Sequence, residues 1–238
     1  MRVPPVGSNP WRTGGMPLLN VASTCPATKA LGPGLRAVVW VQGCPLNCPG
    51  CIAPDWIEWR SARLVSPSDL AEELLCHPEI TGLTLSGGEP MMQAAGLAAM
   101  LVNARASREL NVICFTGSTL ERLHTHPPGP GVAELLAQVD LLIDGPYVAA
   151  LNEGRGLRGS RNQRFHYLTD RLLPWADELE GGKRQAEIHV LGDEALLVGV
   201  PPLGVVEGFA LAVEQAIEAN RTLSATSTAS MAVRRYTK

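Results

Sequence analysis

Apolar residues fall into short β-branched runs and longer stretches rich in Ala and Leu. The short runs, which predict buried strands, are Ala37–Val41, Gly82–Leu85, Asn111–Phe115 and Leu141–Ile143. The longer stretches predict helices, and they are Ser66–Leu75, Met92–Ser107 and Val132–Gln138. Strands that alternate with helices indicate crossover units and a parallel sheet, so the predicted fold class is α/β.

The two ends of the chain have a different pattern. The start is rich in Pro, Gly and Asn, which predicts an irregular lead-in. Near the other end, Ala186–Leu191 and Ala195–Val200 flank Gly192-Asp193, a turn signal that predicts a β-hairpin. A closing helix is expected over about Val205–Ala219, before a Ser/Thr/Ala-rich end that predicts disorder. The expected organisation is a lead-in over residues 1–30, one domain over 31–219 and a tail over 220–238.

Composition narrows the choice of partners. The 238 residues are 45% hydrophobic, which is enough to bury the core of one domain. The formal net charge of −3 gives no general attraction to nucleic acid or to an anionic membrane surface. The sequence has no apolar run of the roughly 18 residues that a membrane span needs. Its first residues have no apolar core of a secretory signal, so the cytoplasm is expected.

Three of the six cysteines fall within eight residues, directly after the strand Ala37–Val41. Cys44, Cys48 and Cys51 have the spacing C-x3-C-x2-C, without a fourth cysteine nearby. A cubane 4Fe–4S cluster normally takes four thiolates, so three would leave one iron open. An open coordination position is typical of a catalytic metal site. At that iron, the amino and carboxylate groups of S-adenosylmethionine could bind, and electron transfer would release a 5′-deoxyadenosyl radical.

Zinc and a purely structural cluster are the alternatives. Zinc usually takes four ligands in a closed site, whereas Cys25, Cys76 and Cys114 are scattered and follow no ligand spacing. A fully protein-ligated cluster would need another cysteine group. The three-cysteine loop therefore favours an open cluster.

The loop and several later segments resemble a known family. C-x3-C-x2-C after a strand, preceded by Gln42-Gly43, looks like the radical S-adenosylmethionine superfamily. Gly32-Pro33-Gly34-Leu35-Arg36 resembles a stretch of the activases of glycyl-radical enzymes, and Cys48-Pro49-Gly50-Cys51 with Trp56 is similar to the activating proteins of anaerobic ribonucleotide reductase. Similar segments follow at Phe115–Leu120, at Asp144–Tyr147 and at Leu157–Arg164.

This resemblance covers about residues 31 to 168 and implies a fold and an activity. The fold would be a partial (β/α) barrel of the radical S-adenosylmethionine type, here with a C-terminal hairpin and helix. The activity would be that of an oxidoreductase that generates a glycyl radical on a partner enzyme, with flavodoxin or ferredoxin as reductant. Two alternatives stay open, namely the same radical chemistry on a small molecule or peptide, and a non-catalytic electron carrier. Leu31 and Ser118 depart from the family pattern, which leaves the substrate open.

The other candidate site residues follow the remaining strands. Carboxyl ends of parallel strands meet at one edge of a sheet, so these loops should converge on the cysteines. In the superfamily a Gly-Gly-Glu-Pro segment contacts the methionine amino group, and the resemblance gives this role to Gly87, Gly88 and Glu89. Thr116 and Asp144 end the next two strands, and each is a candidate for cofactor binding or a plain loop residue.

Two further groups are open to two interpretations. Arg158, Arg161 and Arg164 lie in a polar stretch without acidic neighbours, so they either recognise a carboxylate or face solvent. Trp56 and Trp59 follow the cysteines and either shield a cluster from water or pack in the core.

Overall fold

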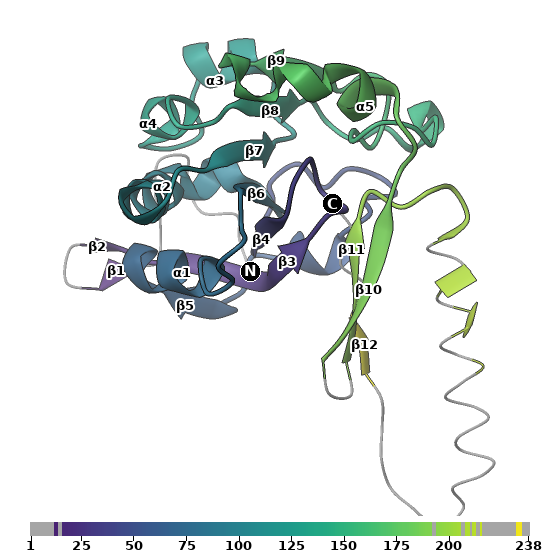
Figure 1. The fold of residues 1–238 in the computed structure, drawn as a ribbon, viewed down its shortest axis with the longest axis horizontal. Helices are drawn as coiled ribbons and strands as arrows, with labels where there is room; N and C mark the ends of the chain where they lie inside the picture. Colours follow the sequence, from purple (N-terminus) through teal and green to yellow (C-terminus); the bar gives the residue numbers. More distant parts are fainter. Residues whose placement is uncertain are drawn as a thin grey trace, which may run out of the picture.

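The centre of the molecule is an open seven-stranded sheet of order β5-β3-β4-β6-β7-β8-β9 (Figure 1). The computed structural model describes residues 12–13, 16–191, 194–205, 208–209, 211–212, 215 and 232–234. In chain order, the strands of the sheet are β3 (Leu19–Thr28), β4 (Arg36–Val41), β5 (Arg63–Val65), β6 (Gly82–Gly87), β7 (Asn111–Phe115), β8 (Leu141–Asp144) and β9 (Arg164–Tyr167).

The four strands β4, β6, β7 and β8 run parallel to one another. On their flanks, β3 and β5 on one side and β9 on the other pair antiparallel. The predicted α/β class with a parallel sheet is therefore confirmed for the central strands. The sheet ends at β5 and β9 and does not close into a barrel.

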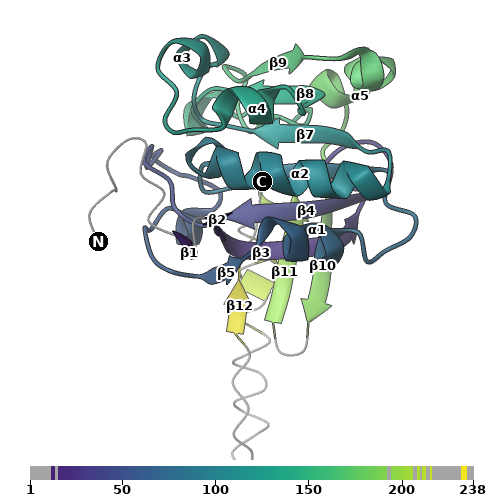
Figure 2. The ribbon, with the colours of Figure 1, turned by 90° about the vertical axis from the view of Figure 1, so that its left-hand side faces the viewer.

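Helices cover one face of this sheet, onto which Figure 2 looks. Buried Leu, Ala and Val side chains of α1 (Pro67–Leu74), α2 (Ala94–Ser107) and α4 (Val132–Leu136) form one apolar core with the strands. The Ser66 hydroxyl accepts a hydrogen bond from Asp69 N at 3.1 Å, so α1 starts at the predicted cap. The other helices are α3 (Leu120–Thr125), α5 (Ala176–Gly181) and the 3-10 turns Pro54–Trp56, Pro90–Gln93, Ala149–Leu151 and Asp170–Trp175.

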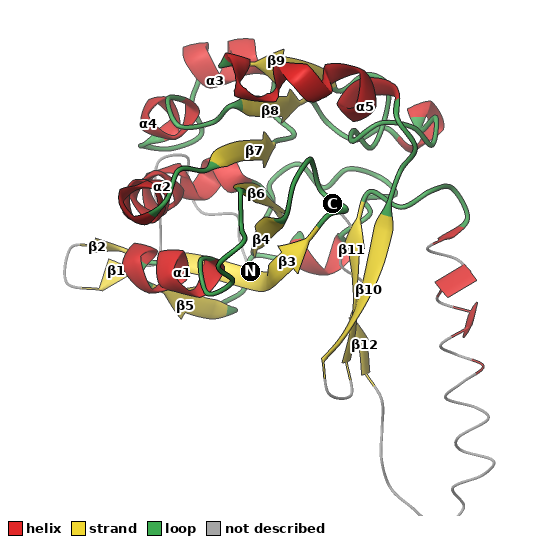
Figure 3. Ribbon diagram, in the orientation of Figure 1, coloured by secondary structure: helices red, strands yellow, loops and turns green. Residues whose placement is uncertain are grey.

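The opposite face packs against the C-terminal hairpin, which lies on the other side of the sheet from α1 and α2 in Figure 3. The hairpin strands are β10 (Ala186–Leu191) and β11 (Glu194–Gly199), which confirms the predicted hairpin. Leu196 and Val198 of β11 join Trp40 and Trp56 in a second apolar core. Three short strands complete the description, namely β1 (Arg12–Thr13), β2 (Met16–Pro17) and β12 (Ala232–Arg234), which pairs parallel with β11.

The prediction of an irregular lead-in over residues 1–30 is wrong for Leu19–Thr28, which form β3. Pro26 lies in this strand at an exposed position, and the pairing with β4 shifts register between Cys25 and Thr28. An irregular strand with a proline carries little alternation, which is why the pattern failed here. The closing helix over Val205–Ala219 and the tail over 220–238 lie largely outside the described residues.

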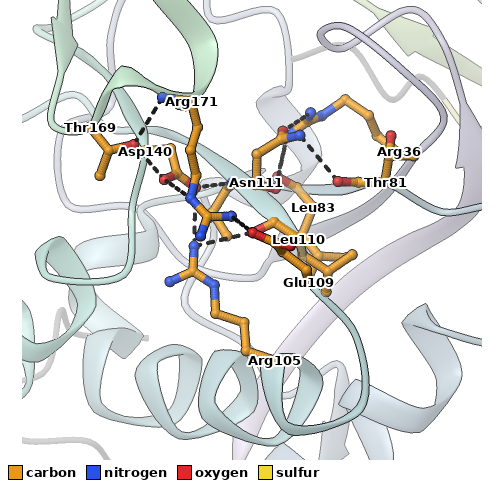
Figure 4. A network of polar contacts seen from close by, with 11 residues as sticks. Arg36, Thr81, Leu83, Arg105, Glu109, Leu110, Asn111, Asp140, Thr169 and Arg171 are labelled. Carbon is orange, nitrogen blue, oxygen red and sulfur yellow. Dashed lines mark hydrogen bonds and ion pairs between the residues drawn. The ribbon is translucent and has the colours of Figure 1, made fainter.

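At the amino ends of the strands, Arg36 is completely buried. Its guanidinium donates to Thr84 Oγ1 at 2.8 Å and to Pro33 O at 3.2 Å. It also donates to Leu83 O at 2.6 Å and to Asn111 Oδ1, two residues labelled in Figure 4. Burial lowers the pKa of Arg36 to about 9, and the charge of Asp140 opposes this shift. Arg36 thus ties β4, β6 and β7 together through their backbone and polar side chains.

Asp140, just before β8, is a buried acidic residue at the same amino end of the sheet (Figure 4). Its carboxylate accepts hydrogen bonds from Val112 N at 2.7 Å, from Arg105 at 3.0 Å and from Thr169 Oγ1 at 2.6 Å. Arg171 adds an ion pair at 3.7 Å. These contacts join α2, β7, β8 and the chain after β9, so this end of the sheet is a structural network.

A carboxylate of the hairpin also reaches the amino end. Glu187 of β10 accepts hydrogen bonds from Thr28 Oγ1 and Lys29 N, each at 2.8 Å, and lies 2.9 Å from His189 Nε2. Burial alone would raise the pKa of Glu187, but these hydrogen bonds outweigh it and lower the pKa. Glu187 therefore fastens the hairpin to the end of β3.

Candidate functional site

Loops that follow β4, β6, β7 and β8 surround one cavity at the carboxyl ends of the strands. The cavity is open to solvent and measures about 560 Å³ when the space is counted out to its mouth. Its lining residues are Cys44, Leu46, Cys48, Cys51, Ile52, Ala53, Ser86, Gly87, Gly88, Glu89, Phe115, Thr116, Gly117, Gly145, Tyr147 and Gln163. The loops therefore converge at one edge of the sheet, as predicted.

The cysteine loop turns back on itself after β4. Gly43, Asn47 and Gly50 have positive φ angles of 100°, 44° and 72°, a region that favours glycine and tolerates asparagine. Cys51 N donates to Cys48 O at 3.1 Å, and Cys44 N donates to Ile57 O at 3.0 Å. These turns place all three thiols, each partly exposed, on the wall of the cavity.

The donor set of the cavity suits an iron–sulfur cluster. Thiolates are the ligands that iron–sulfur clusters use, and the described lining residues contain three cysteines and no fourth. Among the described residues, no three His, Cys, Asp or Glu side chains are arranged to hold a single metal ion. A cubane needs no such arrangement, because each thiolate binds a different iron. Burial, and then the charge of Glu89, raise the pKa of the free Cys44 thiol to about 12.

The Gly-Gly-Glu loop is bonded directly to the cysteine loop. Gly88 N donates to Val41 O at 2.7 Å, and Glu89 N donates to Gly43 O at 2.9 Å. A Cβ atom on Gly88 would lie 2.3 Å from Gly43 O, and one on Gly87 would lie 2.3 Å from Val41 N. The resemblance implies that Gly87 and Gly88 contact the methionine amino group. Both line the cavity, and at the same time the backbone of β4 lies close to Gly87 and that of the cysteine loop close to Gly88.

The Glu89 carboxylate joins two of the loops, those that follow β6 and β7. It is only 2% exposed, and it accepts from Met91 N at 2.9 Å, from Thr116 Oγ1 at 2.8 Å and from Gly117 N at 2.9 Å. Burial raises the pKa of Glu89 although these hydrogen bonds oppose it. A carboxylate offers about four acceptor positions, so three internal donors leave about one for a donor from a ligand in the cavity.

Asp144, by contrast, is not among the residues that line the cavity. It is fully buried, and its carboxylate accepts from Leu120 N at 2.6 Å and from Arg164 at 2.7 and 3.0 Å. His166 Nε2 lies 3.0 Å from the same carboxylate. These contacts account for Asp144 as an anchor for the start of α3 and for β9, whereas the next residue, Gly145, does line the cavity.

The arginine stretch does have acidic partners, contrary to the sequence interpretation. Arg164 pairs with Asp144 and with Glu121, each at 2.7 Å, and Arg161 lies 3.9 Å from Glu153. The hydrogen bonds from Arg164 lower the pKa of Glu121 to about 2. Partners such as Glu121 lie far away in the sequence, so the local composition gave no sign of them.

Gln163 and Tyr147 line the cavity, although the sequence gave them no specific role. Gln163 Oε1 accepts from Gly159 N at 2.8 Å and from Ser160 N at 3.2 Å, while its Nε2 donates to Gly145 O at 2.9 Å. Gln163 thus holds the loop after β8 against the loop before β9. Its place in the Leu157–Arg164 segment was the only signal in the sequence.

The two tryptophans after the cysteines pack in the interior. Trp56 is 1% exposed and lies with its ring centre 5.5 Å from that of Trp40, and its carbonyl accepts from Gly43 N at 2.8 Å. A Cβ on Gly43 would lie 2.9 Å from the Trp59 ring. The Trp56 backbone and the Trp59 ring therefore lie against Gly43 of the cysteine loop, and the burial of both side chains favours the packing interpretation.

Comparison with known proteins adds an independent finding. The family described as "4Fe-4S single cluster domain" matches residues 30–166, which is more than half of the chain. The chain belongs to this 4Fe–4S single cluster domain family. An anaerobic ribonucleoside-triphosphate reductase-activating protein of Enterobacteria phage T4 is 34% identical over 145 residues, or 58% of this chain and 88% of that protein. The matched residues contain the cysteine loop, so an iron–sulfur cofactor is confirmed.

Two further relatives widen the comparison. A protein of the same description from Vibrio cholerae is 29% identical over 147 residues, covering 58% of this chain and 91% of the relative. A putative glycyl-radical enzyme activating enzyme of Haemophilus influenzae is 35% identical over 97 residues, covering 40% and 36%. The resemblance to activases of glycyl-radical enzymes is thereby confirmed for this 4Fe–4S domain protein.

Proposed function

We propose that this protein is a radical S-adenosylmethionine enzyme that generates a glycyl radical on a partner enzyme, an anaerobic ribonucleotide reductase being the first candidate. The supporting observation is that Cys44, Cys48 and Cys51 line the same cavity as Glu89. Two relatives, aligned with this chain over 88% and 91% of their own length, are named anaerobic ribonucleoside-triphosphate reductase-activating protein. The open sheet would then be the partial barrel of such enzymes.

Each group of residues has a separate task in this proposal. The three cysteines would hold the cluster, which when bound supplies the electron that cleaves S-adenosylmethionine to a 5′-deoxyadenosyl radical. The remaining acceptor position of Glu89 would orient the methionine amino group. Thr116 and Gly117 hold the Glu89 carboxylate in place through their hydrogen bonds. Phe115, Ile52 and Ala53 give the cavity apolar walls that exclude water from the reacting atoms.

The proposal also covers the electron donor, the cellular compartment and the two ends of the domain. A flavodoxin or ferredoxin would supply the electron. The three cluster cysteines would have to stay reduced to bind iron, which a reducing compartment such as the cytoplasm favours. No helix of the described ranges has the length and apolar character to cross a membrane. Because β3 belongs to the central sheet, we place the start of the domain at Leu19 instead of residue 31, and keep residue 219 as its end.

The test uses the full chain, reconstituted with iron and sulfide without oxygen. We expect the reduced protein to form 5′-deoxyadenosine from S-adenosylmethionine. With the reductase present, a glycyl radical should appear in electron paramagnetic resonance. Deoxyadenosine without that signal would move the assignment to a small-molecule or peptide substrate. A reconstituted cluster that never cleaves S-adenosylmethionine would refute the radical enzyme and favour an electron carrier.

A further inference from the structure

A second cavity lies apart from the cysteines, between the end of β3, the turn and helix around Trp175, and the start of the hairpin. It measures about 440 Å³ with its open mouth. Its lining residues include Lys29, Trp175, Glu178, Lys183 and Arg184. None of its lining residues lines the cysteine cavity, so the proposed function gives this cavity no role.

The residues that line this cavity carry more positive than negative charge. The chain has only three lysines, Lys29, Lys183 and Lys238, and two of the three are lining residues. Both are exposed, and within the described ranges neither ammonium has a carboxylate at ion-pair distance. Arg184 adds a third positive charge, against the single carboxylate of Glu178. Three cations and one anion give the lining residues a net charge of about +2. The Glu187 carboxylate, which accepts from Lys29 N, does not line the cavity, so the charge of the lining itself favours an anionic ligand.

Arg184 is the buried member of this group, with 8% of its surface exposed. It donates to Arg158 O at 2.7 Å, to Gly159 O at 3.1 Å and to Pro201 O at 3.2 Å, and its Nε has no partner among the described atoms. Burial lowers the pKa of Arg184, with a smaller contribution from the charge of Arg158. A buried cation held only by carbonyl oxygens is under-compensated, and a nearby anion would relieve that cost.

The walls of the cavity are apolar, and Trp175 is their most prominent part. Trp175 is 41% exposed, whereas Trp40, Trp56 and Trp59 are each at most 9% exposed. Leu157, Leu179 and Val200 are buried and supply the rest of the apolar surface. An exposed indole beside ammonium groups can stack on a planar ring while the cations bind the anionic end of the same molecule.

We propose that this second cavity binds a small organic anion, with its ring against Trp175 and its phosphate or carboxylate group between Lys29 and Lys183. The ligand class follows from the two kinds of surface that meet here. Neither the apolar wall nor the cations alone would select such a molecule. The site is independent of the cluster, and its occupation does not require cleavage of S-adenosylmethionine.

Titration calorimetry of the reconstituted protein tests this proposal. Phenyl phosphate and benzoate are the probes with ring and anion, and inorganic phosphate and phenol are the two halves. We expect saturable binding of phenyl phosphate or benzoate with a Kd below about 1 mM, and weaker binding of phosphate and phenol. The better of the first two probes tells which anion the site prefers. No saturation with either probe would overturn the proposal.

Variants locate the binding site. The double variant Lys29→Gln/Lys183→Gln should weaken binding at least about tenfold, since two charge-assisted contacts are lost. Trp175→Ala should weaken phenyl phosphate about fivefold and leave inorganic phosphate unchanged. Arg122→Gln is the matched control, because it removes a positive charge from an exposed position outside the cavity. Equal affinity in the double variant and the control would place the probe elsewhere and refute the site.

Acylation of lysines followed by mass spectrometry gives a second readout. Bound phenyl phosphate should slow the modification of Lys29 and Lys183, and phenol at the same concentration should slow it less. Uniform modification rates in the presence and absence of the probe would contradict the proposal. Because neither measurement involves S-adenosylmethionine, a failure here is distinguishable from a failure of the proposed enzymatic function.

Discussion

The two ends of the central sheet use polar residues in opposite ways. At the amino end, Arg36 and Asp140 are buried. They form hydrogen bonds with the backbone and side chains of neighbouring strands. At the carboxyl end, the cysteine thiols line an open cavity. The Glu89 carboxylate there has about one acceptor position that no described donor of the protein uses. Polar groups that are satisfied internally stabilise the fold, while polar groups left accessible are available for chemistry.

The sharpest way to break this comparison is to change a cysteine. Cys48→Ser should remove the cluster and reduce deoxyadenosine formation by at least about 10³-fold, while the free energy of unfolding of the apo-protein changes little. Iron and sulfide analysis and chromatography of deoxyadenosine measure the effect. Cys76→Ser, at an exposed cysteine away from the cavity, is the matched control. Normal cleavage by the Cys48 variant would show that the loop does not hold the catalytic cluster.

The amino end should give the reverse result. Arg36→Met should lower the free energy of unfolding by about 3 kcal/mol, because it leaves several buried acceptors unpaired. Activity per folded, cluster-loaded molecule should stay the same. Denaturant unfolding and normalised rates check the two parts, with Arg122→Met as the exposed control. A change in normalised rate as large as the change in stability would erase the distinction between the two ends.

Gly88→Ala tests the join between the two loops of the site. Its Cβ would meet Gly43 O at 2.3 Å, so the Gly-Gly-Glu loop must move away from the cysteine loop. We expect a loss of about 2 kcal/mol in the free energy of unfolding, a typical cost of overpacking. The rate per cluster should also fall, as Glu89 moves with its loop. Gly129→Ala is the control, since a Cβ there would have no neighbour within 4 Å; equal behaviour of the two variants would argue against the contact.

The smallest expected effect concerns pH and the hairpin. The folded pKa of Glu187 lies below its ordinary value of 4.5, so its stabilising contribution is present above that pH and is lost as pH falls through the folded pKa. Glu187→Gln should therefore destabilise the protein at pH 7 by only about 0.5 kcal/mol, because Glu187 is partly exposed and solvent screens its interactions. Unfolding measured from pH 7 to pH 3 should show the two curves converging. A constant difference at all pH values would rule out the carboxylate as the tether.

Local patterns in the sequence determined the central strands, the main helices, the hairpin and the cysteine loop. Each of these features depends on residues that are close together in the sequence. Examples are the apolar run Ala37–Val41 and the spacing of Cys44, Cys48 and Cys51. The convergence of loops also followed, because the carboxyl ends of parallel strands meet at one edge. The strand β3 was missed, since Pro26 and a shift of register conceal its alternation.

Only the tertiary structure decided what each polar residue contacts. Asp144 pairs with Arg164 and does not line the cavity, whereas Gln163 lines it and donates to Gly145 O. Gly87 lies close to the backbone of β4, and Gly88 lies close to the backbone of the cysteine loop. The second cavity brings Lys29 beside Lys183, 154 positions later in the sequence. Spacing along the chain reports on neighbours within one loop or helix, whereas contacts between distant segments depend on how the sheet and hairpin pack.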